Sequence, residues 1–323
     1  MQRTLLTSIA LIAALAVSIP SRIEAQGRPW SKDYFPNLPV VTQDGKTLRF
    51  YDDLIKDKMV VISFIYTSCT DICPITTSRM AQVEEKLGES VGRDVFIYSI
   101  SVDPETDTPE RLKKYAETFQ AGPGWLFLTG KLADIRQINS KLGEQMRSLS
   151  EHRNEIVIGN EATGAWQRDN LFGDIDRVVA SVRSLDPKWR EQVHTPPKGN
   201  ANMGLIPLNG PPGQALFVKL CAGCHTVGKG DRAGPDLNGI IARHPRSWLS
   251  SFITNPDKMR AQNDPAALSL VAKFPNVRMP NMGLTEADAA DLISYVELLM
   301  YRVSGAPSGS QDTSAPAEHH HHH

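Results

Sequence analysis

The sequence predicts an α/β domain followed by a small all-α domain. Apolar runs typical of buried strands alternate with helix-periodic segments up to about residue 183. A segment rich in proline and glycine follows, over residues 184–212. Beyond it, a C-x-x-C-H motif precedes a helical C-terminal segment. We expect a short helix at 213–220 and a final helix at 285–301, where Thr285 and Asp288 form a variant of the capping box. A chain of 323 residues is long enough for two domains that each bury a core.

The first domain is expected to fold as a thioredoxin-like unit with a central mixed sheet flanked by helices. Two long apolar runs are typical of strands buried on both faces, and Thr108 before Pro109 marks the start of a helix. The order of elements, with a hairpin and a last helix at the end, fits this fold. We expect strands at 38–41, 48–50, 59–67, 94–102, 125–128, 155–158 and 164–167, and helices at 75–87, 108–119, 132–142 and 175–182.

Composition and the chain ends indicate an exported globular protein. A net charge of −1, with 41% hydrophobic and 22% charged residues, is ordinary for globular domains and gives no electrostatic basis for nucleic-acid binding. Residues 1–25 resemble a signal peptide: Arg3 precedes an apolar stretch that is short for a membrane span. We therefore expect a periplasmic or otherwise exported protein, tethered to the membrane if this segment is not cleaved. Residues 304–323 form a tail that ends in a histidine tag.

The cysteines Cys69 and Cys73 lie where a predicted strand passes into a helix, with Pro74 after them. At a helix start they are about one turn apart, so both sulfurs could share one soft metal ion or form a disulfide. Helix N-termini favour thiolate over thiol. Three interpretations follow: a structural disulfide, a thiol–disulfide oxidoreductase, or a copper site completed by a further ligand. The thioredoxin redox motif has two residues between its cysteines, whereas this one has three.

Residues from about 34 to 183 resemble the Sco/SenC family of copper-handling proteins. In that family the two cysteines of a C-x-x-x-C-P motif and a late histidine bind copper, which here implies Cys69, Cys73 and His152. The family often has proline where Thr70 stands, and its late hairpin has a tighter turn than residues 159–164, but neither difference removes a ligand. The segments that carry the resemblance are 69–74, 99–104, 107–109, 125–130 and His152.

The second motif, with Cys221, Cys224 and His225, is typical of covalent c-type haem attachment. Residues from about 212 to 302 resemble a small class I cytochrome c. In that family the histidine of the motif is the proximal iron ligand, and a methionine before the final helix is the distal one. The resemblance therefore implies iron ligation by His225 and Met279, with Met282 and Met259 as competing candidates. It also implies that the carbonyl of Pro235 accepts a hydrogen bond from His225.

The domains are expected at residues 1–25 (signal peptide), 26–183 (Sco/SenC copper-binding domain), 184–212 (linker), 213–303 (cytochrome c domain) and 304–323 (tail). With copper and haem c as cofactors, the combination indicates a metallochaperone and electron-transfer protein rather than an enzyme. The resemblance implies the binuclear copper site of cytochrome c oxidase subunit II, or another copper enzyme, as client. Redox partner proteins are also expected. The alternative is a haem-coupled thiol–disulfide oxidoreductase or peroxide reductase, for which copper is incidental and His152 is not needed.

Overall fold

The computed structural model describes residues 30, 32–70, 72–144, 155–189 and 210–304. The predicted signal peptide, His152, most of the linker and the tail lie outside the described residues. Within the described part of the chain, no helix is both long enough and apolar enough to cross a membrane.

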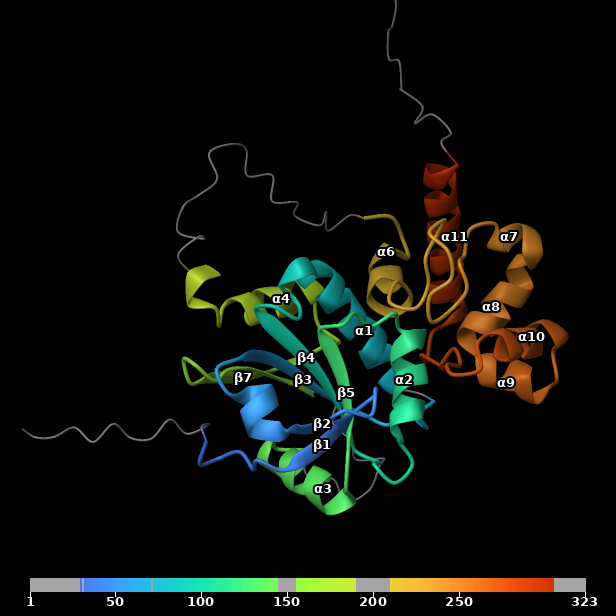
Figure 1. Ribbon diagram of the computed structural model, residues 1–323. Helices are drawn as coiled ribbons and strands as arrows, with labels where there is room; N and C mark the ends of the chain where they lie inside the picture. The colour runs from blue at the N-terminus through green and yellow to red at the C-terminus, as the bar shows by residue number, and fades with distance from the viewer. Residues whose placement is uncertain (1–29, 31, 71, 145–154, 190–209, 305–323) are drawn as a thin grey trace, which may run out of the picture.

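The N-terminal domain is built on one seven-stranded mixed sheet (Figure 1). Its strand order is β2-β1-β5-β4-β3-β6-β7. The three central strands β5, β4 and β3 are parallel to one another, whereas the outer strands join the sheet antiparallel. The strands are β1 (Pro39–Thr42), β2 (Thr47–Arg49), β3 (Met59–Ile65), β4 (Val95–Ser101), β5 (Trp125–Thr129), β6 (Glu155–Asn160) and β7 (Ala165–Asn170). This arrangement confirms the predicted thioredoxin-like fold.

Two apolar cores fill the two faces of this sheet. All seven residues of β3 are buried, as expected for a strand covered on both sides. On one face the core is formed with α1 (Ile72–Leu87), α2 (Pro109–Thr118) and α4 (Ile175–Arg183). On the other face it is formed with η1 (Phe50–Ile55) and α3 (Leu132–Lys141). A short 3-10 turn, η2 (Gly88–Ser90), follows α1.

The helix α1 begins three residues earlier than the hydrophobic periodicity predicted. It starts at Ile72 rather than at Ile75, so Cys73 lies in its first turn. Pro74 also fits there, because the first turn of a helix does not need its N–H groups for internal hydrogen bonds. The second thiol is therefore held by helical backbone and not by a loop.

The C-terminal domain is helical, and it has more helices than the sequence patterns suggested. The final helix begins with the predicted capping box between Thr285 and Asp288. Two unforeseen helices begin with the pairs Asn255-Pro256 and Asp264-Pro265, in which the first side chain caps and proline takes the first turn. The elements are α6 (Gln214–Leu216), η4 (Phe217–Cys221), α7 (Ile240–Arg243), α8 (Arg246–Thr254), α9 (Pro256–Ala261), α10 (Pro265–Lys273) and α11 (Glu286–Val303).

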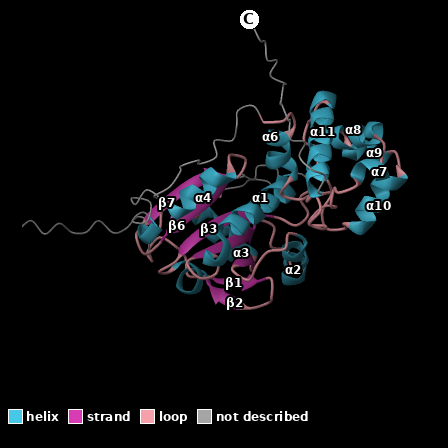
Figure 2. Cartoon of the chain, turned by 90° about the horizontal axis from the view of Figure 1, so that it is seen from above, coloured by secondary structure: helices cyan, strands magenta, loops and turns pink. Residues whose placement is uncertain are grey.

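The two domains are packed against each other along α1. Figures 1 and 2 both show α1 beside the segment that begins the C-terminal domain. Ala233 and Val277 of the C-terminal domain belong to the core cluster that α1, α2 and α4 enclose, and Cys224 packs against the same cluster. Polar contacts lie around this apolar contact, including a hydrogen bond of 3.1 Å from Asn276 to Thr118. The interface therefore continues the core of the N-terminal domain.

Candidate metal and haem sites

The two thiols of the N-terminal domain lie together beneath the protein surface. Cys69 has 8% of its surface exposed, and Cys73 has none. The backbone N–H of Cys73 donates a hydrogen bond of 3.3 Å to the sulfur of Cys69. The pair is not joined in a disulfide in the structure. Both sulfurs are therefore placed where one soft metal ion could bind them, as predicted from their spacing.

A buried carboxylate, Asp107, holds the strand end that leads to these cysteines. Its Oδ1 atom accepts hydrogen bonds from the N–H of Thr67, at 3.0 Å, and from the Thr67 hydroxyl, at 2.5 Å. Its Oδ2 atom accepts one of 2.6 Å from the hydroxyl of Ser101. Burial raises the pKa of Asp107 against the opposing effect of these hydrogen bonds. The sequence analysis noted Asp107 only as part of a motif, because nothing in the sequence shows that it reaches back to Thr67.

The expectation that the helix start favours thiolate is wrong for Cys73. Its pKa is raised well above the ordinary value, first by the interaction with Cys69 and then by burial. Both effects favour the neutral thiol, and together they outweigh the field of the helix. Metal binding would have to displace the thiol protons, as it does in thiolate metal sites generally.

The third predicted copper ligand, His152, lies outside the described residues. Among the residues that the structure does describe, no three His, Cys, Asp or Glu side chains are grouped so that they could hold a metal ion. The described part of the candidate copper site therefore consists of the two cysteines. The assignment of His152 stays a prediction.

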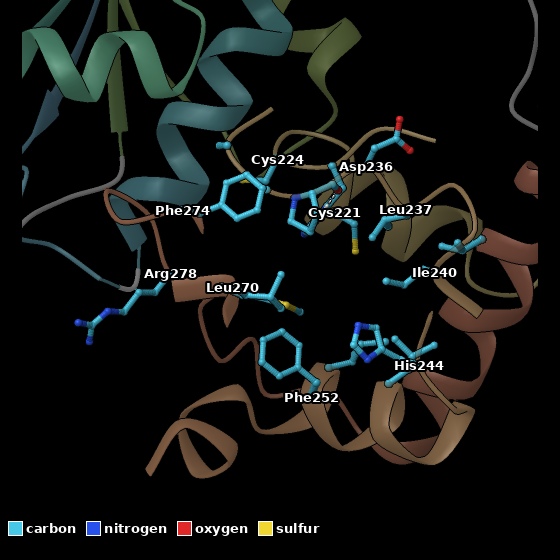
Figure 3. A pocket seen from close by; sticks show the side chains of 18 of the residues that line it. Cys221, Cys224, Asp236, Leu237, Ile240, His244, Phe252, Leu270, Phe274 and Arg278 are labelled. Carbon is cyan, nitrogen blue, oxygen red and sulfur yellow. Dashed lines mark hydrogen bonds between the residues drawn. The ribbon is translucent and has the colours of Figure 1, made fainter. Parts of the chain in front are cut away.

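The C-x-x-C-H motif opens onto a cavity of about 640 Å³, within the range of ~300–1,000 Å³ common for small-molecule and cofactor sites. Figure 3 shows Cys221 and Cys224 on one side of it, with His244 and Phe252 on the opposite side. Most of the wall is apolar, formed by residues such as Leu237, Leu249, Leu270, Phe274, Leu292 and Val296. Two thiols at the rim of an apolar cavity of this size fit a covalently attached haem.

The imidazole of His225 is held in one orientation by its neighbours. Its Nδ1 atom lies 2.9 Å from the carbonyl oxygen of Pro235, which is the contact that the family resemblance implied. When Nδ1–H donates this hydrogen bond, Nε2 keeps its lone pair for a metal. A Cβ atom on Gly234 would lie 2.6 Å from Cε1 of His225, so only glycine fits beside the ring. Burial lowers the pKa of His225, which favours the neutral form that ligates iron.

Two methionines line the cavity, Met279 and Met282, whereas Met259 does not. The backbone carbonyl of Met279 accepts a hydrogen bond of 3.1 Å from Arg260, which fixes the Met279 segment against α9. His244, which the sequence analysis left without a role, also lines the cavity and stacks on Trp248 at 4.1 Å between ring centroids. The cavity thus contains the predicted distal ligand, one of its competitors and a second imidazole.

Replacing Met279 with alanine should lower the midpoint potential of the haem on the order of 100 mV, because a thioether ligand raises the potential of a His-ligated haem. The matched variant Met282→Ala should leave the potential unchanged. Redox titration of both haem-loaded variants measures this directly. A large drop in Met282→Ala alone would assign the distal position to Met282 instead.

Asp236 organises the loop that carries His225. Its two carboxylate oxygens accept backbone hydrogen bonds from Gly228, at 2.8 Å, Gly230, at 2.6 Å, and Asn238, at 2.7 Å. Burial raises the pKa of this carboxyl, but the hydrogen bonds outweigh burial and hold the pKa at about 2. Because the pKa is depressed in the folded state, the carboxylate stabilises the protein above about pH 4, and this contribution is lost as the pH falls through about 2.

Asp236→Asn should therefore lower the free energy of unfolding by about 1 kcal/mol at pH 7. This value takes into account that solvent screens the charge of a largely exposed carboxylate. The difference between variant and wild type should shrink as the pH falls from 4 towards 2. Denaturant unfolding of both proteins at several pH values, followed at the haem absorption band, measures it. A difference that stays constant down to pH 2 would show that the charge of Asp236 does not stabilise the loop.

The haem cavity reaches the helix that carries Cys73. Pro74 and Ile75, the two residues after Cys73, line the cavity together with residues of the C-terminal domain. The N-terminal domain thus completes the wall of the cavity in the other domain. A cofactor in this cavity would lie against the two residues that follow Cys73, one of the candidate copper ligands.

Arg79, in the middle of α1, joins the two domains through backbone carbonyls. It is buried, with 3% of its surface exposed. Its guanidinium donates hydrogen bonds to the carbonyls of Leu171, Gly173 and Lys219, with the latter two at 2.5 Å. Lys219 belongs to η4, which ends at Cys221, so Arg79 holds the start of the C-x-x-C-H motif against the N-terminal domain.

Comparison with known proteins identifies both domains. The family model SCO1/SenC matches residues 34–158, and the family model Cytochrome c matches residues 211–299. A SCO1 protein homolog of Bacillus subtilis is 40% identical over 117 residues, which are 36% of this chain and 59% of that protein. A SCO2-like protein of Rickettsia conorii is 33% identical over 105 residues, 32% of this chain and 49% of that protein. The chain thus spans about half the length of the curated relatives it matches.

Solved structures of Sco proteins are also similar to part of this chain. A SCO1/SenC family lipoprotein from Bacillus anthracis is 24% identical, with a TM-score of 0.41, and the match covers 47% of this chain and 94% of that one. Arabidopsis thaliana ScoI with copper bound is 25% identical, with a TM-score of 0.39, and the match covers 48% of this chain and 96% of that one. Each of these two matches covers about half of this chain. Residues 34–158 of this chain thus form a SCO1/SenC domain, and residues 211–299 form a cytochrome c domain.

Proposed function

We propose that this protein is an exported copper chaperone that carries its own c-type haem and passes electrons between haem and copper. Copper is bound by Cys69, Cys73 and His152. Haem is attached to Cys221 and Cys224, with His225 and Met279 as iron ligands. The protein assists assembly of the binuclear copper site of cytochrome c oxidase, by copper delivery, by redox control of copper and cysteines, or by both.

The observation that carries this proposal is the shared wall between the two sites. Pro74 and Ile75 line the haem cavity and follow Cys73 directly in the sequence. If the cytochrome c domain served only to bind the protein to an oxidase, its haem cavity would not need to lie against the helix that carries Cys73. Both cofactors are one-electron centres, whereas a disulfide of Cys69 and Cys73 is a two-electron couple that needs two haem turnovers. Copper is therefore the better immediate partner of the haem.

A second function, haem-coupled thiol–disulfide exchange, is favoured by one specific observation. The two thiols are adjacent, with the N–H of Cys73 only 3.3 Å from the sulfur of Cys69. Such a pair could cycle between dithiol and disulfide without any metal. His152 separates the two functions, because a three-ligand copper site needs it and a thiol reductase does not. Copper content unchanged in His152→Ala would favour the reductase.

The decisive experiment mixes full-length protein, with ferrous haem, rapidly with stoichiometric Cu(II) and follows the haem absorption bands. Haem oxidation should be independent of protein concentration, as expected of transfer within one molecule. It should be absent in Cys69→Ala, which keeps the haem but lacks a copper ligand. If wild-type haem stays reduced when both sites are fully occupied, electron transfer between the sites is ruled out.

A further inference from the structure

The chain between α10 and α11, residues 274–285, carries the predicted distal iron ligand and forms neither helix nor strand. We call it the methionine segment. Between residues 275 and 284, only the N–H groups of Val277 and Gly283 donate a hydrogen bond to another residue that the structure describes. The backbone of the segment therefore does little to fix its own position. The place of Met279 has to be set by contacts with other parts of the chain.

The N-terminal domain holds the methionine segment at the two residues that stand three and two places before Met279. Val277 has 8% of its surface exposed and belongs to the core cluster of the N-terminal domain rather than to the cluster of its own domain. The side-chain amide of Asn276 donates a hydrogen bond of 3.1 Å to the hydroxyl of Thr118, the last residue of α2. Two consecutive residues are thus anchored to the other domain.

Within its own domain, the methionine segment is tied to α9 through Arg260. The guanidinium of Arg260 donates a hydrogen bond of 3.1 Å to the carbonyl oxygen of Met279 and pairs with Asp257 at 2.5 Å. Figure 3 shows Phe274 directed into the cavity and Arg278 extending away from it. Met279 therefore lies between one attachment in its own domain and two attachments on the N-terminal domain.

We propose that Asn276 and Val277 are positioning residues for Met279. By anchoring the methionine segment to the N-terminal domain, they keep the thioether sulfur in place to ligate the haem iron. This inference rests on the proposed function, in which Met279 is the distal ligand, and adds that the copper-binding domain supports haem ligation in the other domain. Separation of the domains then weakens the iron–sulfur bond and lowers the midpoint potential of the haem, because a thioether ligand raises that potential.

The first test compares Val277→Ala with Val271→Ala in full-length, haem-loaded protein. Val271 lines the same cavity, but it lies in α10 and is held by helical backbone. Both variants remove two methyl groups from the cavity wall. Only Val277→Ala removes them from the core cluster of the N-terminal domain. Val271→Ala is therefore the control for a change in the cavity wall as such.

The measurement is the rate of cyanide binding to ferric protein, because the iron–sulfur bond has to break before an iron–carbon bond can form. Val277→Ala should bind cyanide about tenfold faster than wild type, since the loss of buried methyl groups favours release of the segment. It should also show a weaker charge-transfer band of methionine-ligated haem. Val271→Ala should match wild type in both. Equal rates in the two variants would overturn the inference.

The second test changes the N-terminal domain alone. Neither Thr118 nor Asn276 lines the cavity, so Thr118→Val leaves every residue of the cavity wall in place. Loss of their hydrogen bond should speed cyanide binding about two- to fivefold in Thr118→Val and in Asn276→Ala alike. The double variant should be no faster than either single variant, because both changes remove the same bond.

Additive effects of the two changes, or wild-type rates in both single variants, would overturn the inference while leaving the ligand set intact. If the ferric wild type shows no charge-transfer band of methionine-ligated haem, the ligand set of the proposed function is wrong instead. The two failures are therefore distinguished by the spectrum of the wild-type protein before any cyanide is added.

Discussion

Serine in place of Cys73 should lower the affinity for Cu(I) about 100-fold or more, because two thiolates supply most of the affinity of such a site. Cys73 is fully buried in the first turn of α1, so no other side chain can easily replace its sulfur. Serine is close in size to cysteine and keeps the helix start, so the change removes the ligand and little else. Competition titration against a Cu(I) chelator measures the loss.

Thr76→Ser is the control for this prediction, because it alters a buried side chain on the same turn and leaves both sulfurs in place. It should bind copper as the wild type does. Stoichiometric, tight Cu(I) binding in Cys73→Ser would mean that the copper site lies elsewhere. The same titration on Cys69→Ser should give a loss of similar size, since both thiols belong to one site.

The second large effect is expected at Arg79, where alanine should reduce the free energy of unfolding by about 3 kcal/mol or more. The arginine donates to carbonyls of Leu171, Gly173 and Lys219 while almost wholly buried. Without the guanidinium, the three carbonyl oxygens lose their hydrogen-bond donors, and a cavity is left where the side chain was. Lysine should not rescue the loss, because its single ammonium group cannot match the planar fork of the guanidinium. Denaturant unfolding of the haem-loaded protein measures the change.

Arg232→Ala provides the comparison, because Arg232 also reaches across the domain interface. It pairs with Glu85 at 3.2 Å, with the carboxylate largely exposed to solvent. An exposed pair of this kind is worth at most about 1 kcal/mol. If both variants lost the same small amount of stability, the buried hydrogen bonds of Arg79 would not hold the domains together.

The sequence predicted the parts of this protein that depend on local patterns. The strand before Cys69, the cap at Thr108 and the capping box at Thr285 follow from short-range rules, and all three are present. The thiolate character of Cys73 was predicted wrongly, because its pKa depends on burial and on the second thiol, and neither is visible in a local motif.

The docking of the two domains could not be predicted, because it depends on contacts between residues far apart in the chain. Gly223 lies so close to Ser78 of α1 that a Cβ atom on it would be 2.5 Å from the Ser78 hydroxyl oxygen. Most of the N-terminal domain and the linker separate these two residues in the sequence, and neither belongs to a local pattern that predicts the contact. The same holds for Arg79, whose acceptors come from the loop between β7 and α4 and from η4. The helices that begin at Pro256 and Pro265 do have a local signal in the sequence, the pairs Asn255-Pro256 and Asp264-Pro265, from which they could have been predicted.

The packing of Cys224 against the core of the N-terminal domain bears on the maturation that the proposed function requires. An enzyme that attaches haem has to reach the sulfur of Cys224, and in the docked protein Cys224 packs against the core cluster that α1, α2 and α4 enclose. We therefore expect attachment to come first, while the C-terminal domain is still apart from the N-terminal one. A molecule that docks before it receives haem would then be lost to the maturation pathway.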